Sequence, residues 1–287
     1  MRHPARPAAA GAATVTIYQP PVDPAARAGY DDGHPRRMGF FTDTSVCIGC
    51  KACEVACKEW NGVPEDGLNF LGQSYDNTGE LGANTWRHVA FIEQQVPAQG
   101  GGDIRWLMSS DVCKHCTSAA CLEVCPTGSL IRTEFGTVVV QQDICNGCGY
   151  CVTACPFGVI DKREDDGRVW KCTLCYDRIS DGLQPACAQA CPTQSIQFGA
   201  LDDLRPRAAA RVDELQARGV DAARLYGHDE SDGVGGMGAF FLLLDEPEVY
   251  GLPPDPVSTT RDLPAMWRSA AKAAAVLVAA GIASFVR

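Results

Sequence analysis

Hydrophobic and polar residues follow a strand-like pattern in several short stretches of the chain. These stretches are rich in Thr, Trp, Val, Phe and Ile, the residue types that favour β-strands. The strands predicted in this way cover residues 85–94, 104–110, 195–198 and 239–244. A hairpin is also expected within residues 131–145, where the chain should turn at Phe135 and Gly136.

Helical patterns lie between these strands. Residues 52–60 and 122–125 are expected to form short helices directly around cysteines. A longer helix should begin at Asp202 or Asp203, because either carboxylate can cap its first turn. It should continue until Gly219, a residue type that commonly ends helices.

The last segment of the chain, residues 269–286, is apolar except for Lys272 and is also predicted to be helical. Its uncharged part, residues 273–286, has 14 residues, whereas a spanning helix needs about 20. We expect this helix to lie against or cross a membrane, with Trp267 at the interface. A buried or interfacial helix is the alternative.

The first 40 residues are rich in Ala and Pro with little periodicity, which predicts a flexible arm. A short strand is conceivable at residues 14–18. No continuous apolar core marks a secretory signal. Arg36 and Arg37 form a twin-arginine pair, but Cys47 follows before any apolar stretch, so we interpret the pair as a solvated tail. We therefore expect no signal peptide of the chain's own, and export would depend on a partner.

All 16 cysteines fall into four groups of four, and the third group, Cys145 to Cys155, has the most specific pattern. It reads C-x2-C-x2-C-x3-C-P, the bacterial ferredoxin spacing for iron–sulfur ligation. Gly147 and Gly149 should let this loop turn tightly, since glycine adopts left-handed backbone angles without a clash. In two-cluster ferredoxins the fourth cysteine of such a run binds the other cluster.

The remaining cysteine groups vary this spacing. The first has Lys58 in place of the proline, the second widens one gap and ends at Pro126, and the fourth widens its middle gap to eleven residues and ends at Pro192. The first group is Cys47, Cys50, Cys53 and Cys57; the second is Cys113, Cys116, Cys121 and Cys125; the third is Cys145, Cys148, Cys151 and Cys155; the fourth is Cys172, Cys175, Cys187 and Cys191. Four groups of four predict four cubane clusters.

Zinc ligation and disulfide bonds are the alternative uses of these cysteines. A zinc site closes with four ligands, usually in two separated pairs, whereas residues 145–155 hold four cysteines in one run. A chain of 287 residues is long enough to bury a core without disulfides. Both alternatives are therefore disfavoured, although a zinc-binding interaction scaffold remains the rival from another functional class.

Composition narrows the function further. The formal net charge is −10, which makes nucleic acid an unsuitable partner, and four clusters would add about −8 more. No nucleophile–base pair or nucleotide-binding fingerprint stands out, so we expect no catalytic activity of the chain alone and no small-molecule substrate. His88 is expected to be structural or exposed. His115 lies between two cysteines of a complete group, so a supporting role is expected rather than metal ligation.

With these features placed, the chain resembles the iron–sulfur beta subunit of membrane-bound respiratory formate dehydrogenase over about residues 40–280. The four groups alone fit the wider class of electron-transfer subunits of nitrate, dimethyl sulfoxide and polysulfide reductases. The stretches YDNTGELGANTWRHVAF and VWKCTLCYDRIS contribute to the resemblance. The insertion with GANTW, the helix before RGVDAARLYG, the stretch EPEVYGLPPDP and the C-terminal helix narrow it to the formate dehydrogenase type. Nitrate reductase relatives replace one ligand by Trp, and every ligand position here is Cys.

The resemblance implies that the ligand sets cross between the groups. Set A is Cys47, Cys50, Cys53 and Cys191; set B is Cys57, Cys172, Cys175 and Cys187; set C is Cys113, Cys116, Cys121 and Cys155; set D is Cys125, Cys145, Cys148 and Cys151. Each set would hold one [4Fe-4S] cluster, with all sixteen cysteines as iron ligands.

The resemblance also implies partners and a task. Electrons from formate oxidation would enter from a molybdenum- or tungsten-containing molybdopterin catalytic subunit and leave towards a membrane cytochrome b and quinone. The complex would be membrane-associated in anaerobic respiration, on the periplasmic or outer face if it is exported with its partner and otherwise on the cytoplasmic face. The alternative is an electron-transfer subunit of another molybdopterin oxidoreductase.

The expected fold class is α+β, with two ferredoxin-like two-cluster modules, an insertion and a C-terminal helix. The expected parts are an N-terminal arm (1–42), an outer module (43–60 with 169–200), the insertion (61–109), an inner module (110–168), a wrapping segment (201–262) and the C-terminal helix (263–287).

Overall fold

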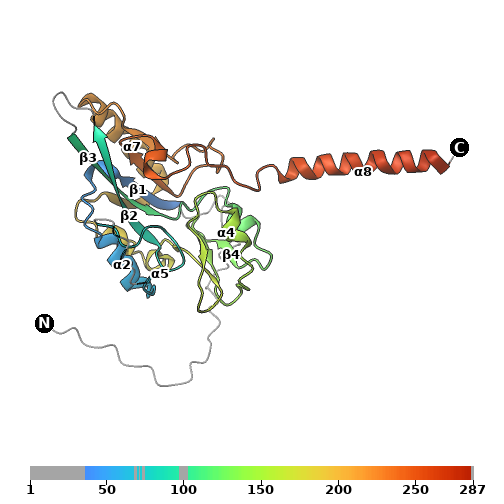
Figure 1. The fold of residues 1–287 in the computed structure, drawn as a ribbon, viewed down its shortest axis with the longest axis horizontal. Helices are drawn as coiled ribbons and strands as arrows, with labels where there is room; N and C mark the ends of the chain where they lie inside the picture. The colour runs from blue at the N-terminus through green and yellow to red at the C-terminus, as the bar shows by residue number, and fades with distance from the viewer. Residues whose placement is uncertain (1–35, 68–69, 71, 73–74, 97–102, 286–287) are drawn as a thin grey trace, which may run out of the picture.

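The computed structural model of the protein describes residues 36–67, 70, 72, 75–96 and 103–285. The strand considered at residues 14–18 lies outside the described residues. Helices and strands are mixed along the chain, as expected for an α+β fold, and the C-terminal helix α8 (Leu263–Phe285) extends away from the body (Figure 1).

A four-stranded sheet joins segments that are far apart in the sequence. Its order is β8 (Ile196–Ala200), β1 (Met38–Asp43), β10 (Ala239–Leu243) and β9 (Arg224–Tyr226). Strand β1 is parallel to β10, pairing Phe40 with Ala239, and antiparallel to β8, pairing Phe40 with Phe198. The expectation of an arm up to residue 42 is therefore wrong at its end, because β1 lies in the middle of this sheet.

The two faces of the sheet support different parts of the molecule. On one face, Phe41 and Phe240 stack with ring centroids 5.3 Å apart and pack with α7 (Leu201–Ala217). On the other face, Phe40 belongs to the apolar core that also contains Cys53 and Cys187. The alternation of side chains along β1 thus places the sheet directly against the cysteine loops.

Helix α7 begins at Leu201, and its N-cap is Ala200 rather than the predicted Asp202 or Asp203, so no side chain caps it. The N–H of Leu201 donates to the carbonyl of Arg37 at 2.9 Å, so the segment that precedes β1 satisfies this end of the helix. Asp203 pairs instead with the guanidinium of Arg36. Gly219 follows the end of the helix with φ 86°, as predicted.

The twin-arginine pair is not the solvated tail that the sequence suggests. Arg36 is exposed and pairs with Asp203, but Arg37 is partly buried. Its guanidinium donates to the carbonyl of His115 and to the hydroxyl of Thr117, both in the second cysteine group. Arg37 therefore ties the start of β1 to a cysteine loop.

The remaining elements flank the cysteines. The predicted insertion hairpin is present as β2 (Arg87–Val96) and β3 (Asp103–Val112), antiparallel throughout. The predicted second hairpin consists of β4 (Leu130–Arg132) and β5 (Val138–Val140), and β6 (Asp161–Lys162) pairs with β7 (Val169–Trp170). The short helices are α2 (Ala52–Asn61), α3 (Ala120–Glu123), α4 (Tyr150–Ala154), α5 (Tyr176–Ser180) and α6 (Ala186–Gln189), with 3-10 turns η1 (Thr44–Val46) and η2 (Pro247–Tyr250).

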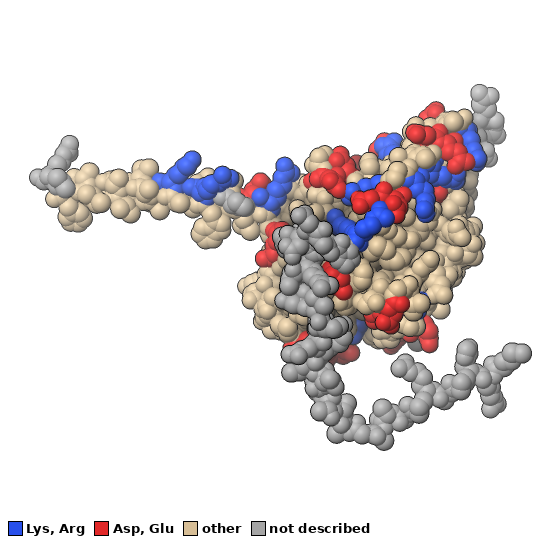
Figure 2. All heavy atoms as spheres, turned by 180° about the vertical axis from the view of Figure 1, so that it is seen from behind, with Lys and Arg blue, Asp and Glu red and all other residues tan. Residues whose placement is uncertain are grey.

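Helix α8 (Leu263–Phe285) is 23 residues long, much longer than the uncharged run suggests. Of the helices in the described residues, it is the one that is long and apolar enough to cross a membrane, over Ala265–Phe285. This 21-residue stretch is about 31 Å long at 1.5 Å per residue, and the hydrocarbon core of a bilayer is about 30 Å thick. The charged residues Arg268 and Lys272 lie in its first half, and Figure 2 shows the outer half without Lys or Arg.

Candidate cluster-binding sites

Each cysteine loop is bent by residues in the left-handed region of backbone space. Gly49 and Lys51 have φ 64° and 57° in the first group, and His115 has φ 45° in the second. Gly147 and Gly149 have φ 68° and 80° in the third group, as predicted. The fourth group has Leu174 and Cys175 at φ 59° and 50°. These bends let cysteines two or three residues apart face a common point.

Two cavities are each lined by four cysteines that come from two different groups. The first cavity is lined by the cysteines of set A, together with Val89, Ser110 and Ile196. The second is lined by the cysteines of set C, with apolar Val138, Val159 and Ile160 around them. In both cases the fourth cysteine of a distant group completes the wall, so the donor set fits a [4Fe-4S] cluster at each place.

The cysteines of the other two sets are also neighbours. Burial raises the pKa of Cys57 well above its ordinary value, and the charges of Cys172, Cys187 and Cys175 add to this effect. Burial raises the pKa of Cys151 to about 11, with contributions from Cys125, Cys148 and Cys145. The cysteines that act on Cys57 and on Cys151 are therefore the other three members of sets B and D, respectively.

These thiols need a cation in order to ionise. Burial raises the pKa of Cys121 and that of Cys172 to about 12 each, and neighbouring thiolates oppose the charge further. Cys125 differs: burial acts to raise its pKa, but hydrogen bonds from Ser129 and Thr127 to its sulfur outweigh burial and lower the pKa to about 7.

Neighbouring sets interact in a fixed order. Cys187 of set B contributes to the raised pKa of Cys53 in set A, although burial is the larger cause. In the same way Cys113 of set C acts on Cys172 of set B. Cys151 of set D acts on Cys121 of set C. The sets therefore neighbour one another in the order A, B, C, D, an order that the sequence alone does not reveal.

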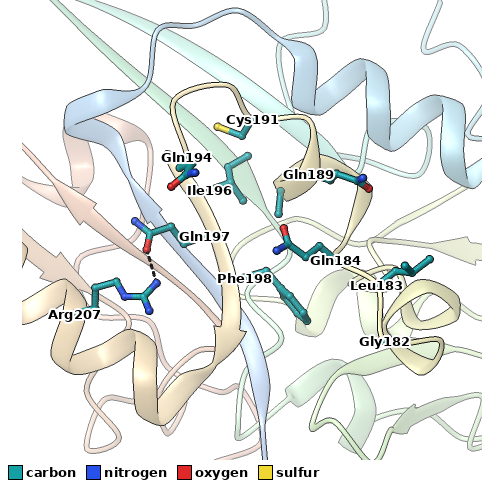
Figure 3. Close-up of a pocket in the computed structure, with 11 residues that line it drawn as sticks. Gly182, Leu183, Gln184, Gln189, Cys191, Gln194, Ile196, Gln197, Phe198 and Arg207 are labelled. Atoms are coloured by element: carbon teal, nitrogen blue, oxygen red, sulfur yellow. Dashed lines mark hydrogen bonds between the residues drawn. The ribbon is translucent and has the colours of Figure 1, made fainter.

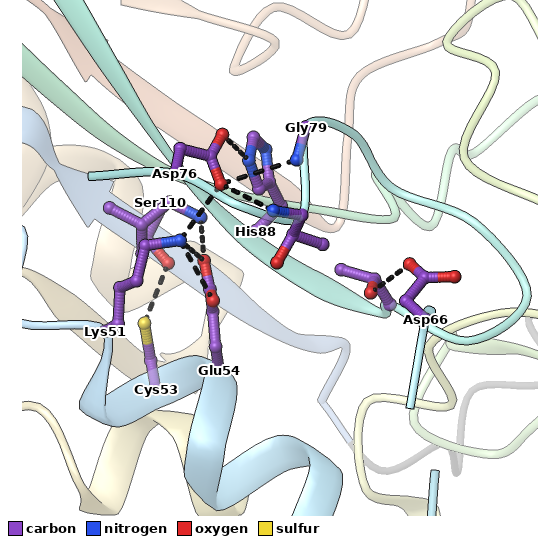
Figure 4. A network of polar contacts seen from close by, with 11 residues as sticks. Lys51, Cys53, Glu54, Asp66, Asp76, Gly79, His88 and Ser110 are labelled. Atoms are coloured by element: carbon purple, nitrogen blue, oxygen red, sulfur yellow. Dashed lines mark hydrogen bonds and ion pairs between the residues drawn. The ribbon is translucent and has the colours of Figure 1, made fainter. Parts of the chain in front are cut away.

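A buried polar network holds the insertion against set A (Figure 4). Lys51 pairs with both Glu54 and Asp76 at 3.1 Å, and Asp76 lies 2.6 Å from Nε2 of His88. Ser110 of the hairpin lies 3.2 Å from the sulfur of Cys53. His88 is thus structural, as predicted, whereas no sequence pattern indicates Asp76, because its partners come from separate segments.

Buried cations and the buried imidazole of His115 also lie near the cysteines. Arg87, Lys114 and Lys171 are each at most 2% exposed. Lys114 and Lys171 line the cavity of set C together with His115. The ring Nδ1 of His115 accepts from the backbone N–H of Val138 at 3.1 Å, so this histidine supports its loop. Sequence reasoning identifies His115 but misses these cations, whose burial depends on the tertiary fold.

A surface cleft lies beside Cys191, between the fourth cysteine group, β8 and α7 (Figure 3). Its walls carry the amides of Gln184, Gln189 and Gln194, and Arg207 donates to Gln197 at 3.0 Å. The residues that line it include no pair of a nucleophile and a general base.

Comparison with known proteins agrees with this architecture. The chain matches 4Fe-4S dicluster domain families over residues 46–129 and 104–201. It is 42% identical over 248 residues to the nitrate-inducible formate dehydrogenase iron-sulfur subunit of Escherichia coli, covering 85% of this chain and 80% of that protein. The chain belongs to the formate dehydrogenase iron–sulfur subunits. A second member, from Haemophilus influenzae, is 39% identical over 257 residues, 87% of this chain and 78% of that protein.

A more distant relative is the B subunit of anaerobic dimethyl sulfoxide reductase from Escherichia coli, 36% identical over 171 residues, 60% of this chain and 77% of that protein. The expected resemblance, the ferredoxin-like fold and the presence of 4Fe-4S ligation are thereby confirmed. Like its relatives, this formate dehydrogenase iron–sulfur subunit is an electron-transfer subunit and not the catalytic one.

Proposed function

We propose that this formate dehydrogenase iron–sulfur subunit holds four [4Fe-4S] clusters, in sets A, B, C and D, and conducts electrons along them. When bound, each cluster takes up and releases one electron. The electrons would come from a molybdenum- or tungsten-containing molybdopterin subunit that oxidises formate, and would leave towards a membrane cytochrome b and quinone.

The observation that carries this proposal is the ordered proximity of the sets. Cys53 of set A, Cys187 and Cys172 of set B and Cys113 of set C all lie in one buried core, and the charges of Cys187 and Cys113 act on Cys53 and Cys172, respectively. The wall of set C includes apolar Val138, Val159 and Ile160, which limits contact with water there and favours transfer to a neighbouring set over reaction with solvent.

The two ends of this order differ from its middle. Cys50 of set A and Cys148 of set D are exposed, while the cysteines of sets B and C are all buried or half-buried. Exposed ligands at the terminal sets suit exchange with partner subunits, and buried ligands suit internal transfer. Sets A and D are therefore the proposed entry and exit points.

The position of α8 favours set D as the exit. Thr259, just before this helix, donates to the carbonyl of Ala154 in α4, the helix that carries Cys151 of set D. We propose that α8 crosses or lies against the membrane beside the cytochrome, which makes the subunit membrane-associated. Its face would be periplasmic if a partner exports it and cytoplasmic otherwise.

Contacts between the short helices support the division of the chain into modules. The first and fourth cysteine groups form the outer module (43–60 with 169–200), where α2 packs on α6. The second and third groups form the inner module (110–168), where α3 packs on α4. The hairpin of the insertion (61–109) covers set A, and the segment 201–262, which the sequence predicts as a wrapping segment, instead supplies strands β9 and β10 of the sheet and helix α7, which packs on it.

Metal analysis of anaerobically purified protein tests the cluster content. We expect about sixteen irons per chain, four per cubane, and a brown colour. Stoichiometric zinc with little iron would refute the proposal.

The dimethyl sulfoxide reductase relative supports one alternative donor or acceptor. An experiment on the complex of this subunit with its catalytic subunit distinguishes the two functions. Reduction of the clusters by formate supports the proposal. Oxidation of reduced clusters by dimethyl sulfoxide, without any response to formate, supports the alternative.

A further inference from the structure

Arg87 is the largest of the completely buried side chains in the described structure, and it lies where sets A and B meet. It belongs to β2. Its Nη2 donates to the sulfur of Cys187 in set B at 3.3 Å, and its Nη1 donates to the carbonyl of Ser110 at 3.1 Å. The guanidinium carbon lies 4.8 Å from the centre of the Phe40 ring.

The guanidinium reaches the cysteines of both sets. It contacts Cys187 of set B directly, and its Nη1 lies 3.4 Å from the hydroxyl of Ser110, which in turn lies 3.2 Å from the sulfur of Cys53 in set A. Within the described residues, no Asp or Glu forms an ion pair with Arg87, in contrast to Lys114, which pairs with Asp111. The positive charge of Arg87 is therefore balanced by the ligands of two sets.

This arrangement has a physical consequence for any cluster bound there. A buried charge without a partner is costly, and arginine cannot lose its proton in a protein. Reducing a cluster adds one negative charge, which a fixed positive charge nearby stabilises more strongly when water is excluded. An N–H donor to a ligand sulfur acts in the same direction, because it withdraws electron density from the iron.

We propose that Arg87 is the shared counter-ion of sets A and B and that it raises the reduction potentials of both clusters. This inference rests on the proposed function, since it presupposes clusters in these two sets. The larger effect belongs to set B, because Arg87 contacts Cys187 directly. Arg87 is thus a positioning and tuning residue and does not bind iron itself.

Redox titration followed by electron paramagnetic resonance tests the proposal on the full chain, with iron content measured in parallel. In Arg87→Met, two of the four potentials should fall, one of them by at least tenfold in the reduction equilibrium, or about 59 mV for one electron. The other two potentials should stay unchanged. Arg87→Lys keeps the charge and should restore most of the shift.

Arg105→Met is the matched control, because Arg105 lies on the paired strand β3 and pairs with Asp245 at 3.6 Å, away from the cysteines. It removes the same formal charge and should leave all four potentials unchanged. Equal potentials in wild type and a fully loaded Arg87→Met would overturn the proposal.

If Arg87→Met loses iron, the iron content of Arg87→Lys tests the proposal instead. If Arg87→Lys then retains full iron, the positive charge is what holds the two clusters, and the proposal stands. If Arg87→Lys loses the same iron, the shape of arginine matters rather than its charge, and the proposal fails. Failure of the proposed function looks different, since wild type itself would then contain fewer than about sixteen irons.

Discussion

Replacing Gly147 by Ala should remove one cluster while leaving the rest of the protein folded. Gly147 lies between Cys145 and Cys148 of set D with φ 68°. A Cβ built on it would lie 2.1 Å from the carbonyl oxygen of Gly167 and 3.1 Å from its carbonyl carbon. Both are backbone atoms of a neighbouring turn, so a side-chain rotation cannot relieve the clash.

The free-energy cost of Gly147→Ala has two parts. Left-handed backbone angles cost an alanine roughly 1–2 kcal/mol. Displacing the turn at Gly167 adds the penalty of overpacking, typically about 1–3 kcal/mol. The total of roughly 2–5 kcal/mol is a large fraction of the stability of a domain, which is about 5–15 kcal/mol.

Gly149→Ala is the matched control in the same loop. Gly149 has φ 80°, but a Cβ there meets nothing within 4 Å, so only the backbone cost of roughly 1–2 kcal/mol applies. We expect Gly147→Ala to lose about four of about sixteen irons and the corresponding paramagnetic signal, and Gly149→Ala to keep all of them. The same iron content and the same denaturation midpoint in both variants would refute the reasoning.

Three further outcomes are expected. Cys155→Ser should damage the cluster of set C and Cys125→Ser that of set D, and loss of the same single paramagnetic signal in both variants would contradict the crossed ligand sets. Deletion of residues 269–287 should leave all clusters in place but release the complex from membranes; a deletion variant that stays membrane-bound, or a full-length complex that is soluble without detergent, would count against the anchor. Burial opposes ionisation of Asp76, but the hydrogen bond from His88 outweighs burial and lowers the pKa of this carboxyl group from 3.8 to about 2. The Asp76 carboxylate should therefore stabilise the fold above about pH 4, and this contribution should be lost as the pH falls through 2. Asp76→Asn should accordingly lower the denaturation midpoint at pH 7, and an unchanged midpoint would argue against the network in Figure 4.

The sequence predicts features that depend on residues close together in the chain. The hairpin at residues 131–145 and the glycine turns at Gly147 and Gly149 are predictable because strand pairing and loop closure there are local. The helix at residues 52–60 is also present, because its cysteines and its apolar residues follow one short period.

Features that depend on distant partners are not predictable in this way. Strand β1 looks like the end of an arm rich in Ala, Pro and Gly until its pairing with residues 196–200 and 239–243 is known. Arg37 and Arg87 look like ordinary surface charges, because nothing near them in the sequence indicates their burial. Helix α8 is longer than its uncharged run, because Arg268 and Lys272 end that run without ending the helix.

Because β1 pairs with β10, the four-stranded sheet cannot be completed until most of the chain has been synthesised. Roughly 200 residues separate the paired residues Phe40 and Ala239, which at about 5–20 residues per second takes about 10–40 s on the ribosome. During this time the sheet beside the first cysteine group is incomplete. For most of this time Cys191, the fourth cysteine of set A, has also not been synthesised. The inner module, whose eight cysteines lie between residues 113 and 155, is complete much earlier. A cell that makes this protein must therefore protect the earliest thiols for the longest time, and the inner module can receive its iron while the outer one is still being made.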